Sequence, residues 1–119
     1  MRLLMAAALV LTACPAGAQQ KDDLTDTAGG LRSSCLGEND KFGLGLCGGF
    51  LDGVRATMEL EDMSRPTKLL CRPDDTTRRA MFDSFLGYLK RHPDAESASA
   101  VSVVRNAYIV TWGCDKSRV

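Results

Sequence analysis

The chain has 119 residues, with 15 basic and 15 acidic side chains and a formal net charge of zero. That length leaves room for one domain, and the even charge argues against nucleic acid and anionic membrane surfaces as partners, because both attract clustered basic residues. A domain of this size has a modest core, so covalent cross-links would add considerably to its stability.

The N-terminal residues have the layout of a secretory signal peptide. A lone Arg2 is followed by an apolar run over residues 3–13 and by the small-residue cleavage site Ala16-Gly17-Ala18. The run is too short to span a membrane comfortably. We therefore expect a signal peptide over residues 1–18, a single domain over residues 19–119, and a mature protein in the periplasm.

The same segment also offers a lipid-anchor alternative. Leu11-Thr12-Ala13-Cys14 resembles the bacterial lipobox, in which the cysteine is acylated and becomes the new N-terminus. Pro15 directly after the cysteine and the cleavage site just beyond it favour ordinary removal after Ala18. Either outcome places the mature protein in an oxidising compartment.

The other cysteines form an even set, which in an exported domain indicates disulfides. They are Cys35, Cys47, Cys71 and Cys114. A zinc site is disfavoured because the chain has no C-x-x-C pair and its single histidine, His92, is distant in sequence from every cysteine. We expect two disulfides, no metal and no other cofactor.

Residues 43–60 are expected to form the central helix. Its larger apolar residues recur at the spacing of one helical face: Cys47, Phe50, Leu51, Val54 and Met58. Glycines at positions 48, 49 and 53 each cost about 1 kcal/mol relative to alanine inside a helix, so we expect close packing of neighbouring backbone to compensate. Pro66 disfavours helix at the residue before it, which predicts a loop over residues 62–70.

Three shorter helices are expected around the central one. The first follows an N-cap at Thr25 or Thr27, and its inward residues are Ala28, Leu31 and Cys35. The next ends at His92-Pro93, and its buried stripe is Met81, Phe82, Phe85, Leu86 and Leu89. The last covers about 95–112 with Asp94 as its cap, and its inner face is Ala98, Val101, Val104, Ala107 and Tyr108. The fold class is all-α, a small disulfide-stapled bundle of about four helices.

Helix directions predict how the cysteines pair. In an up-and-down bundle the central helix ends where the 62–70 loop begins, and the last helix returns to that same end. Cys114 then lies beside Cys71, while Cys35 and Cys47 share the opposite end. We expect those two pairings.

The chain shows no catalytic constellation. His92 lies at a helix end before proline, where it is best explained as a cation at the helix C-terminus. The acidic residues Glu59, Glu61 and Asp62 are more typical of a solvated face than of an acid–base pair. The glycine runs lack a Walker lysine and a preceding strand. We expect a binding protein and no enzyme.

Four motifs resemble the Rap/Tai family of type VI secretion immunity proteins. They are C-G-G-F-L-D-G-V at 47–54, L-C-R-P at 70–73, Y-L-K-R-H-P at 88–93 and A-Y-I-V-T-W-G-C at 107–114. Phe50 stands where that family usually has tyrosine, and Trp112-Gly113-Cys114 replaces a commoner Phe-Pro-Cys, which keeps the aromatic packing and the cysteine. The resemblance implies a small helical periplasmic protein, often a homodimer, that blocks the active-site cleft of a peptidoglycan-cleaving amidase.

Exposed loops are the expected inhibitory surface. The partner-binding candidates are Glu59, Glu61, Asp62, Met63, Arg65, His92, Asp94, Glu96 and Ser97. An acidic or histidine-bearing loop could engage the catalytic imidazole of a cysteine amidase. The alternatives are a periplasmic chaperone-like module that binds unfolded proteins, and an envelope subunit with no toxin partner.

Overall fold

The structure is a computed structural model that describes residues 25–38 and 40–115. The helices in these ranges are α1 (Ala28–Cys35), α2 (Lys41–Met63), α3 (Arg78–Arg91), the short 3-10 helix η1 (Pro93–Ser97) and α4 (Ala100–Trp112). The predicted all-α bundle is confirmed. The expected signal peptide over 1–18, including Cys14, lies outside the described residues.

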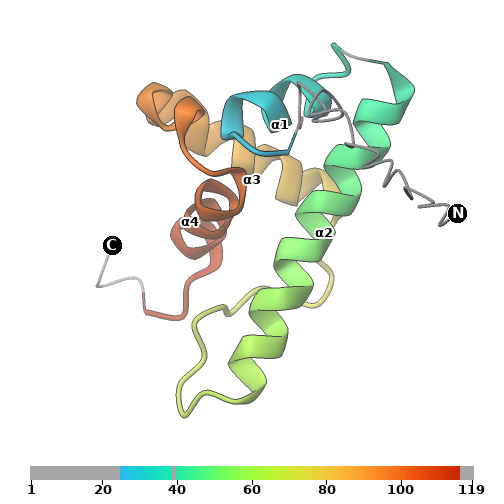
Figure 1. Ribbon diagram of the computed structural model, residues 1–119. Helices are drawn as coiled ribbons and strands as arrows, with labels where there is room; N and C mark the ends of the chain where they lie inside the picture. The colour runs from blue at the N-terminus through green and yellow to red at the C-terminus, as the bar shows by residue number, and fades with distance from the viewer. Residues whose placement is uncertain (1–24, 39, 116–119) are drawn as a thin grey trace, which may run out of the picture.

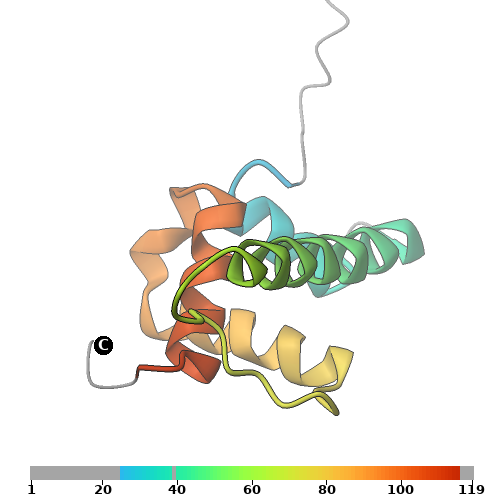
Figure 2. The ribbon, with the colours of Figure 1, turned by 90° about the horizontal axis from the view of Figure 1, so that it is seen from below.

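The helices gather on one side of α2, which is the longest element and runs along one edge of the molecule (Figure 1). Each of the four described α-helices contacts the other three, and α4 packs most extensively against α3. Seen from below, α1 lies above α2 in the view, α3 lies below it, and α4 stands near its left end (Figure 2). One face of α2 is thereby buried and the opposite face is left uncovered.

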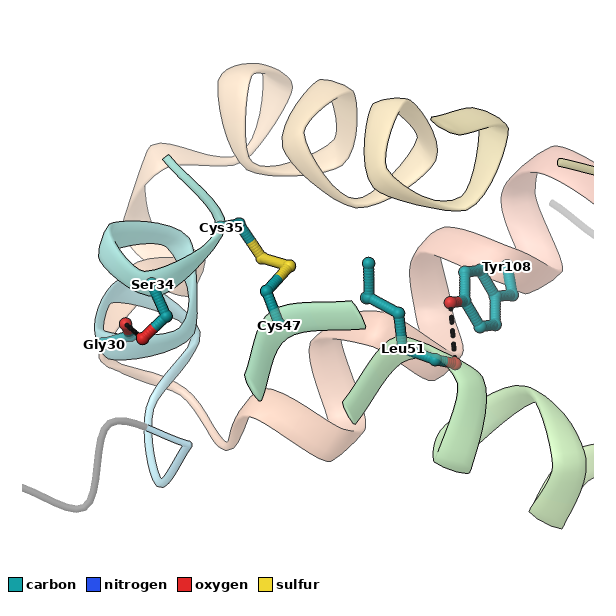
Figure 3. The surroundings of a disulfide bond; sticks show 6 residues. All are labelled: Gly30, Ser34, Cys35, Cys47, Leu51 and Tyr108. Carbon is teal, nitrogen blue, oxygen red and sulfur yellow. Dashed lines mark hydrogen bonds between the residues drawn. A yellow bond between two sulfur atoms is a disulfide. The ribbon is translucent and has the colours of Figure 1, made fainter. Parts of the chain in front are cut away.

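The core is formed where α4 meets the other helices. Its largest fully buried side chains include Tyr108, Phe85, Leu31, Leu51 and Met58. The phenolic O–H of Tyr108 donates a hydrogen bond of 3.0 Å to the backbone carbonyl of Leu51, which ties α4 to the middle of α2 (Figure 3). Burial and, to a smaller extent, the charge of Asp52 raise the pKa of Tyr108 above its ordinary value.

Replacing Tyr108 with phenylalanine is expected to cost about 1 kcal/mol at neutral pH, because the Leu51 carbonyl loses a buried partner. The raised pKa of Tyr108 means that the folded protein holds the phenolic proton more tightly than the unfolded chain. This contribution is fully present below the unfolded pKa of about 10 and is lost as the pH rises above it. Urea denaturation should therefore show that, between pH 8 and pH 10.5, the free energy of unfolding falls less for Tyr108→Phe than for the wild type. Equal alkaline losses of stability in the two proteins would mean that the Tyr108 phenol does not couple folding to pH.

Both disulfides have the predicted pairing. Cys35–Cys47 joins the end of α1 to the first half of α2 (Figure 3). Cys71–Cys114 joins the segment after α2 to the residue that follows the cap of α4. Backbone hydrogen bonds reinforce the second junction, since the Cys71 N–H donates to Trp112 (2.8 Å) and the Cys114 N–H donates to Leu69 (3.1 Å).

The central helix is longer than expected. It begins at Lys41, where the Asp40 side chain accepts the Gly43 N–H, and it continues to Met63 instead of ending near Leu60. Pro66 restricts only the residue before it, so the helix can run on to Met63. The predicted 62–70 loop thus begins at Ser64, and the irregular segment extends to residue 77.

The start of the last helix was also predicted wrongly. Residues 93–97 form η1, α4 begins at Ala100, and Asp94 does not cap it. The backbone at 98–99 is extended because it pairs with the segment before α1: the Ala28 N–H donates to Ala98 and the Ala100 N–H donates to Asp26. The inner face also differs from the predicted one: Ala100 is fully buried, and Val101, about 100° further around the helix, is 47% exposed. The buried residues of α4 are Ala100, Val103, Val104, Ala107 and Tyr108.

Candidate functional site

Two of the expected acidic loop residues lie in α2 and are paired within the molecule. Glu59 accepts hydrogen bonds from Arg55 and Arg72, each at 2.6 Å. Glu61 accepts two from Arg105 of α4, at 3.1 and 3.0 Å. Their charges hold α2 to its neighbours, and the expected acidic loop is absent from this segment.

Asp62 is buried, with 7% of its surface exposed. One carboxylate oxygen accepts the N–H of Leu69 and the other accepts the N–H of Leu70, both at 2.9 Å. A buried carboxylate that satisfies two backbone donors is a strong local clamp. Asp62 therefore fixes the point at which the chain returns from the loop to the bundle.

Between these anchors the chain forms an exposed loop tip, which we define as residues 64–68. Figure 1 shows this segment extending beyond the end of α2. Its sequence is Ser-Arg-Pro-Thr-Lys, so its charged side chains are the cations Arg65 and Lys68. Met63, 84% exposed, adds an apolar side chain at the end of α2, next to the tip. The base of the loop is held by Asp62 and by the Cys71–Cys114 disulfide.

The second set of expected partner-binding residues lies elsewhere. His92 is the C-cap of α3, and its ring packs against Tyr88 with 4.4 Å between centroids. Asp94, Glu96 and Ser97 belong to η1, and Glu96 forms an ion pair of 3.6 Å with Arg32 of α1. Figure 1 places this end of α3 far from the loop tip. The two sets of residues do not form one surface.

A third surface, which the sequence reasoning missed, lies on the uncovered face of α2. We call it the α2 stripe, and it comprises Phe42, Gly45, Leu46, Gly49, Phe50, Gly53, Ala56, Thr57 and Leu60. It contains no charged residue, and Phe42 and Leu60 near its ends are 73% and 67% exposed. The signal was present in the sequence as an uncharged run at helical spacing with glycines every four residues.

The glycines of α2 do not pack as expected. A Cβ at Gly48 would meet the side chain of Arg78 at 3.4 Å, but a Cβ at Gly45, Gly49 or Gly53 would meet nothing within 4 Å. No neighbouring backbone compensates for these three glycines within the described part of the chain. The predicted close packing is wrong for the monomer.

The described residues contain no group of three or more His, Cys, Asp or Glu that could hold a metal ion. None of the helices in the described ranges has the length and apolarity needed to cross a bilayer. The fold presents an exposed loop tip whose base is held in place, and an uncharged helix face. Both surfaces suit contact with another protein.

Comparison with known proteins places the chain in a family. The family of Rap1a immunity proteins matches residues 27–114, a range that begins at the cap of α1 and ends at the second disulfide. Neither a curated protein nor a solved structure matches the chain. The match covers most of the chain and every helix in the part that the structure describes, and it agrees with the resemblance of the four motifs. The chain therefore belongs to the family of Rap1a immunity proteins.

Proposed function

We propose that this protein is a periplasmic immunity protein that inhibits a peptidoglycan-cleaving amidase of type VI secretion by placing its loop tip in the active-site cleft. Family membership supports the immunity role and a protein partner. The two disulfides support export to an oxidising compartment. The observation that carries the choice of surface is the exposed tip at 64–68 on a base clamped by Asp62 and Cys71–Cys114.

A clamped loop suits inhibition by occlusion because each residue that becomes ordered on binding costs conformational entropy. Here the base of the loop is ordered before binding, so less of the contact energy is lost. The tip lies at the end of the bundle next to the end of α2 (Figure 1), and its exposed residues are accessible to the cleft of a partner. No bond needs to be made or broken by the immunity protein.

The side chains at the tip indicate a contact different from the one expected from the sequence. Glu59, Glu61 and Asp62 are engaged inside the molecule, so we assign them the role of supporting the loop. Arg65 and Lys68 are exposed donors, and Met63 is an exposed apolar anchor. We infer that the tip engages carboxylates or carbonyl oxygens at the mouth of the cleft, with Met63 in an apolar part of it.

The test begins with capture of the partner. The oxidised protein is used to pull down proteins from an envelope extract, and the captured amidase is assayed on purified peptidoglycan. Arg65→Glu with Lys68→Glu should weaken inhibition by about 100-fold or more, since reversing charges at the centre of an interface costs several kcal/mol. The control is Lys90→Glu, a charge reversal at an exposed position of α3 that should leave inhibition unchanged.

Full inhibition by the double variant would remove the loop tip from the mechanism. A chain that captures no amidase but suppresses the aggregation of unfolded proteins would support the chaperone-like alternative. A specific non-enzymatic envelope partner would instead favour the role of envelope subunit.

A further inference from the structure

The two disulfides differ in their exposure to solvent. Cys35 and Cys47 are 2% and 3% exposed and belong to the core, whereas Cys71 and Cys114 are both exposed residues. Exposed disulfides are the ones that exchange readily, because an attacking thiolate has to reach a sulfur atom. We propose that Cys114 is a site of reversible modification by a small anionic thiol, which opens the Cys71–Cys114 disulfide and loosens the base of the loop tip.

A pocket of about 390 Å³ lies between the loop tip and the end of α4, beside the exposed disulfide. Cys114 lines it from one side, and Arg65 and Lys68 line it from the loop. The half-buried side chains of Leu69 and Ile109 add apolar surface. The volume falls within the range of small-molecule sites, roughly 300–1,000 Å³. The pocket therefore brings one cysteine of the disulfide and two cations around a space that a small thiol can enter.

The charges of the pocket favour a thiol that carries a second negative group. The attacking species in disulfide exchange is the thiolate, which is itself an anion. Arg65 and Lys68 are both exposed, and their charges exceed that of Asp115, which also lines the pocket. The surplus positive charge raises the local concentration of anions. The chemical class of ligand is thus a small thiol with a carboxylate or a sulfonate.

The exchange step conserves atoms and electrons. The thiol loses its proton to solvent, and its sulfur forms a bond with the Sγ of Cys114. The bond between the Cys114 and Cys71 sulfurs breaks, and Cys71 leaves as a thiolate that takes up a proton. The product is a mixed disulfide at Cys114 and a free thiol at Cys71. Attack of Cys71 on the mixed disulfide expels the small thiol and restores the original bond, so the modification is reversible.

Opening this disulfide weakens the base of the loop tip. The returning chain is then held by the Asp62 carboxylate and by the backbone hydrogen bonds of Cys71 and Cys114, without a covalent link to the end of α4. The added group also occupies the pocket beside Arg65 and Lys68. We expect weaker inhibition of the partner as a result, and this consequence rests on the proposed function. The Cys35–Cys47 disulfide stays closed and keeps the core cross-linked.

The test compares two thiols of similar size and different charge, the anionic mercaptoethanesulfonate and the neutral mercaptoethanol. Oxidised wild-type protein is treated with each, quenched with acid at successive times and analysed by peptide mapping. We expect the mixed disulfide on Cys114, a free thiol at Cys71 and an intact Cys35–Cys47 disulfide. Corrected for the thiolate fraction, the rate constant for the anionic thiol should be about 3-fold or more higher at low ionic strength, and high salt should remove the difference.

A pair of double variants tests the cations. Arg65→Glu with Lys68→Glu should abolish the preference for the anionic thiol, while the rate with mercaptoethanol should stay within about 2-fold of the wild type, since steering by charge acts on the second negative group. Lys90→Glu with Arg91→Glu, at exposed positions of α3, makes the same change in net charge and should keep the preference.

Three results of these measurements would overturn the exchange site. They are a mixed disulfide on Cys71 in place of Cys114, equal reactivity of both disulfides in the folded protein, and equal rates for the two thiols at low salt. None of the measurements requires a partner protein, so their outcome is independent of the proposed function.

The effect on inhibition is measured with the captured amidase. Protein that carries the mixed disulfide should inhibit about 10-fold less tightly than the oxidised protein, and inhibition should recover when the small thiol is removed and the disulfide re-forms. Unchanged inhibition by the modified protein would overturn the regulatory consequence. Failure of the oxidised protein to inhibit would instead overturn the proposed function.

Discussion

Removal of the Cys71–Cys114 disulfide by paired serine substitution should lower the free energy of unfolding by about 4 kcal/mol, from the loop-entropy relation for the 43-residue separation. A loss of that size is a large share of the stability of a small domain. The same change should release the base of the loop tip, because the disulfide anchors the returning chain to the end of α4. We expect both effects in urea denaturation and in an inhibition assay with the captured amidase.

The matched control is paired serine substitution of Cys35 and Cys47. This disulfide spans 12 residues, so its removal should cost about 3 kcal/mol. It lies at the other end of α2 from the loop tip, and the folded fraction of the variant should inhibit normally. If the two variants inhibit equally well after correction for the unfolded fraction, the Cys71–Cys114 junction does not organise the inhibitory surface.

Replacing Asp62 with alanine should cost about 3 kcal/mol, since two charge-assisted hydrogen bonds to the backbone are lost and the donors stay partly buried. The Leu69 and Leu70 N–H groups both depend on this one carboxylate. Native-state hydrogen exchange should show faster exchange of these two amides than of amides in α3. Weaker inhibition should accompany the change because the loop tip is no longer held at its base.

Asp83→Ala provides the comparison for Asp62. Asp83 forms an exposed ion pair with Arg79 one helical turn away, with 54% of its side chain exposed. Such surface pairs contribute roughly 0.5 kcal/mol or less, so this variant should be close to wild type. Equal destabilisation by the two substitutions would mean that Asp62 is not the clamp described here.

Much of the fold could be read from local signals. The α1 cap at Thr27, the buried face of α2 and the end of α3 before Pro93 follow from short-range preferences that tertiary contacts did not override. The start of α4 could not be read this way. Its position depends on pairing of residues 98–99 with the chain before α1, which is distant in sequence.

The candidate surfaces were predictable only in part. Arg65 and Met63 were expected to be exposed, and they are. Asp62 reads as one more surface acid, because the sequence does not show that two backbone N–H groups return to it seven and eight residues later. The opposite error applies to Gly49 and Gly53, which were expected to meet backbone within the molecule and instead lie on the uncovered side of α2.

The sequence by itself determined the helical class, the disulfide set and the family, because these follow from apolar spacing, cysteine number and ordered motifs. Only the tertiary structure decided which acids are internal partners, where the loop begins and which face of the longest helix is left open. Those properties depend on contacts between segments far apart in the chain. A carboxylate or a glycine looks the same in sequence whichever side of the helix its neighbours cover.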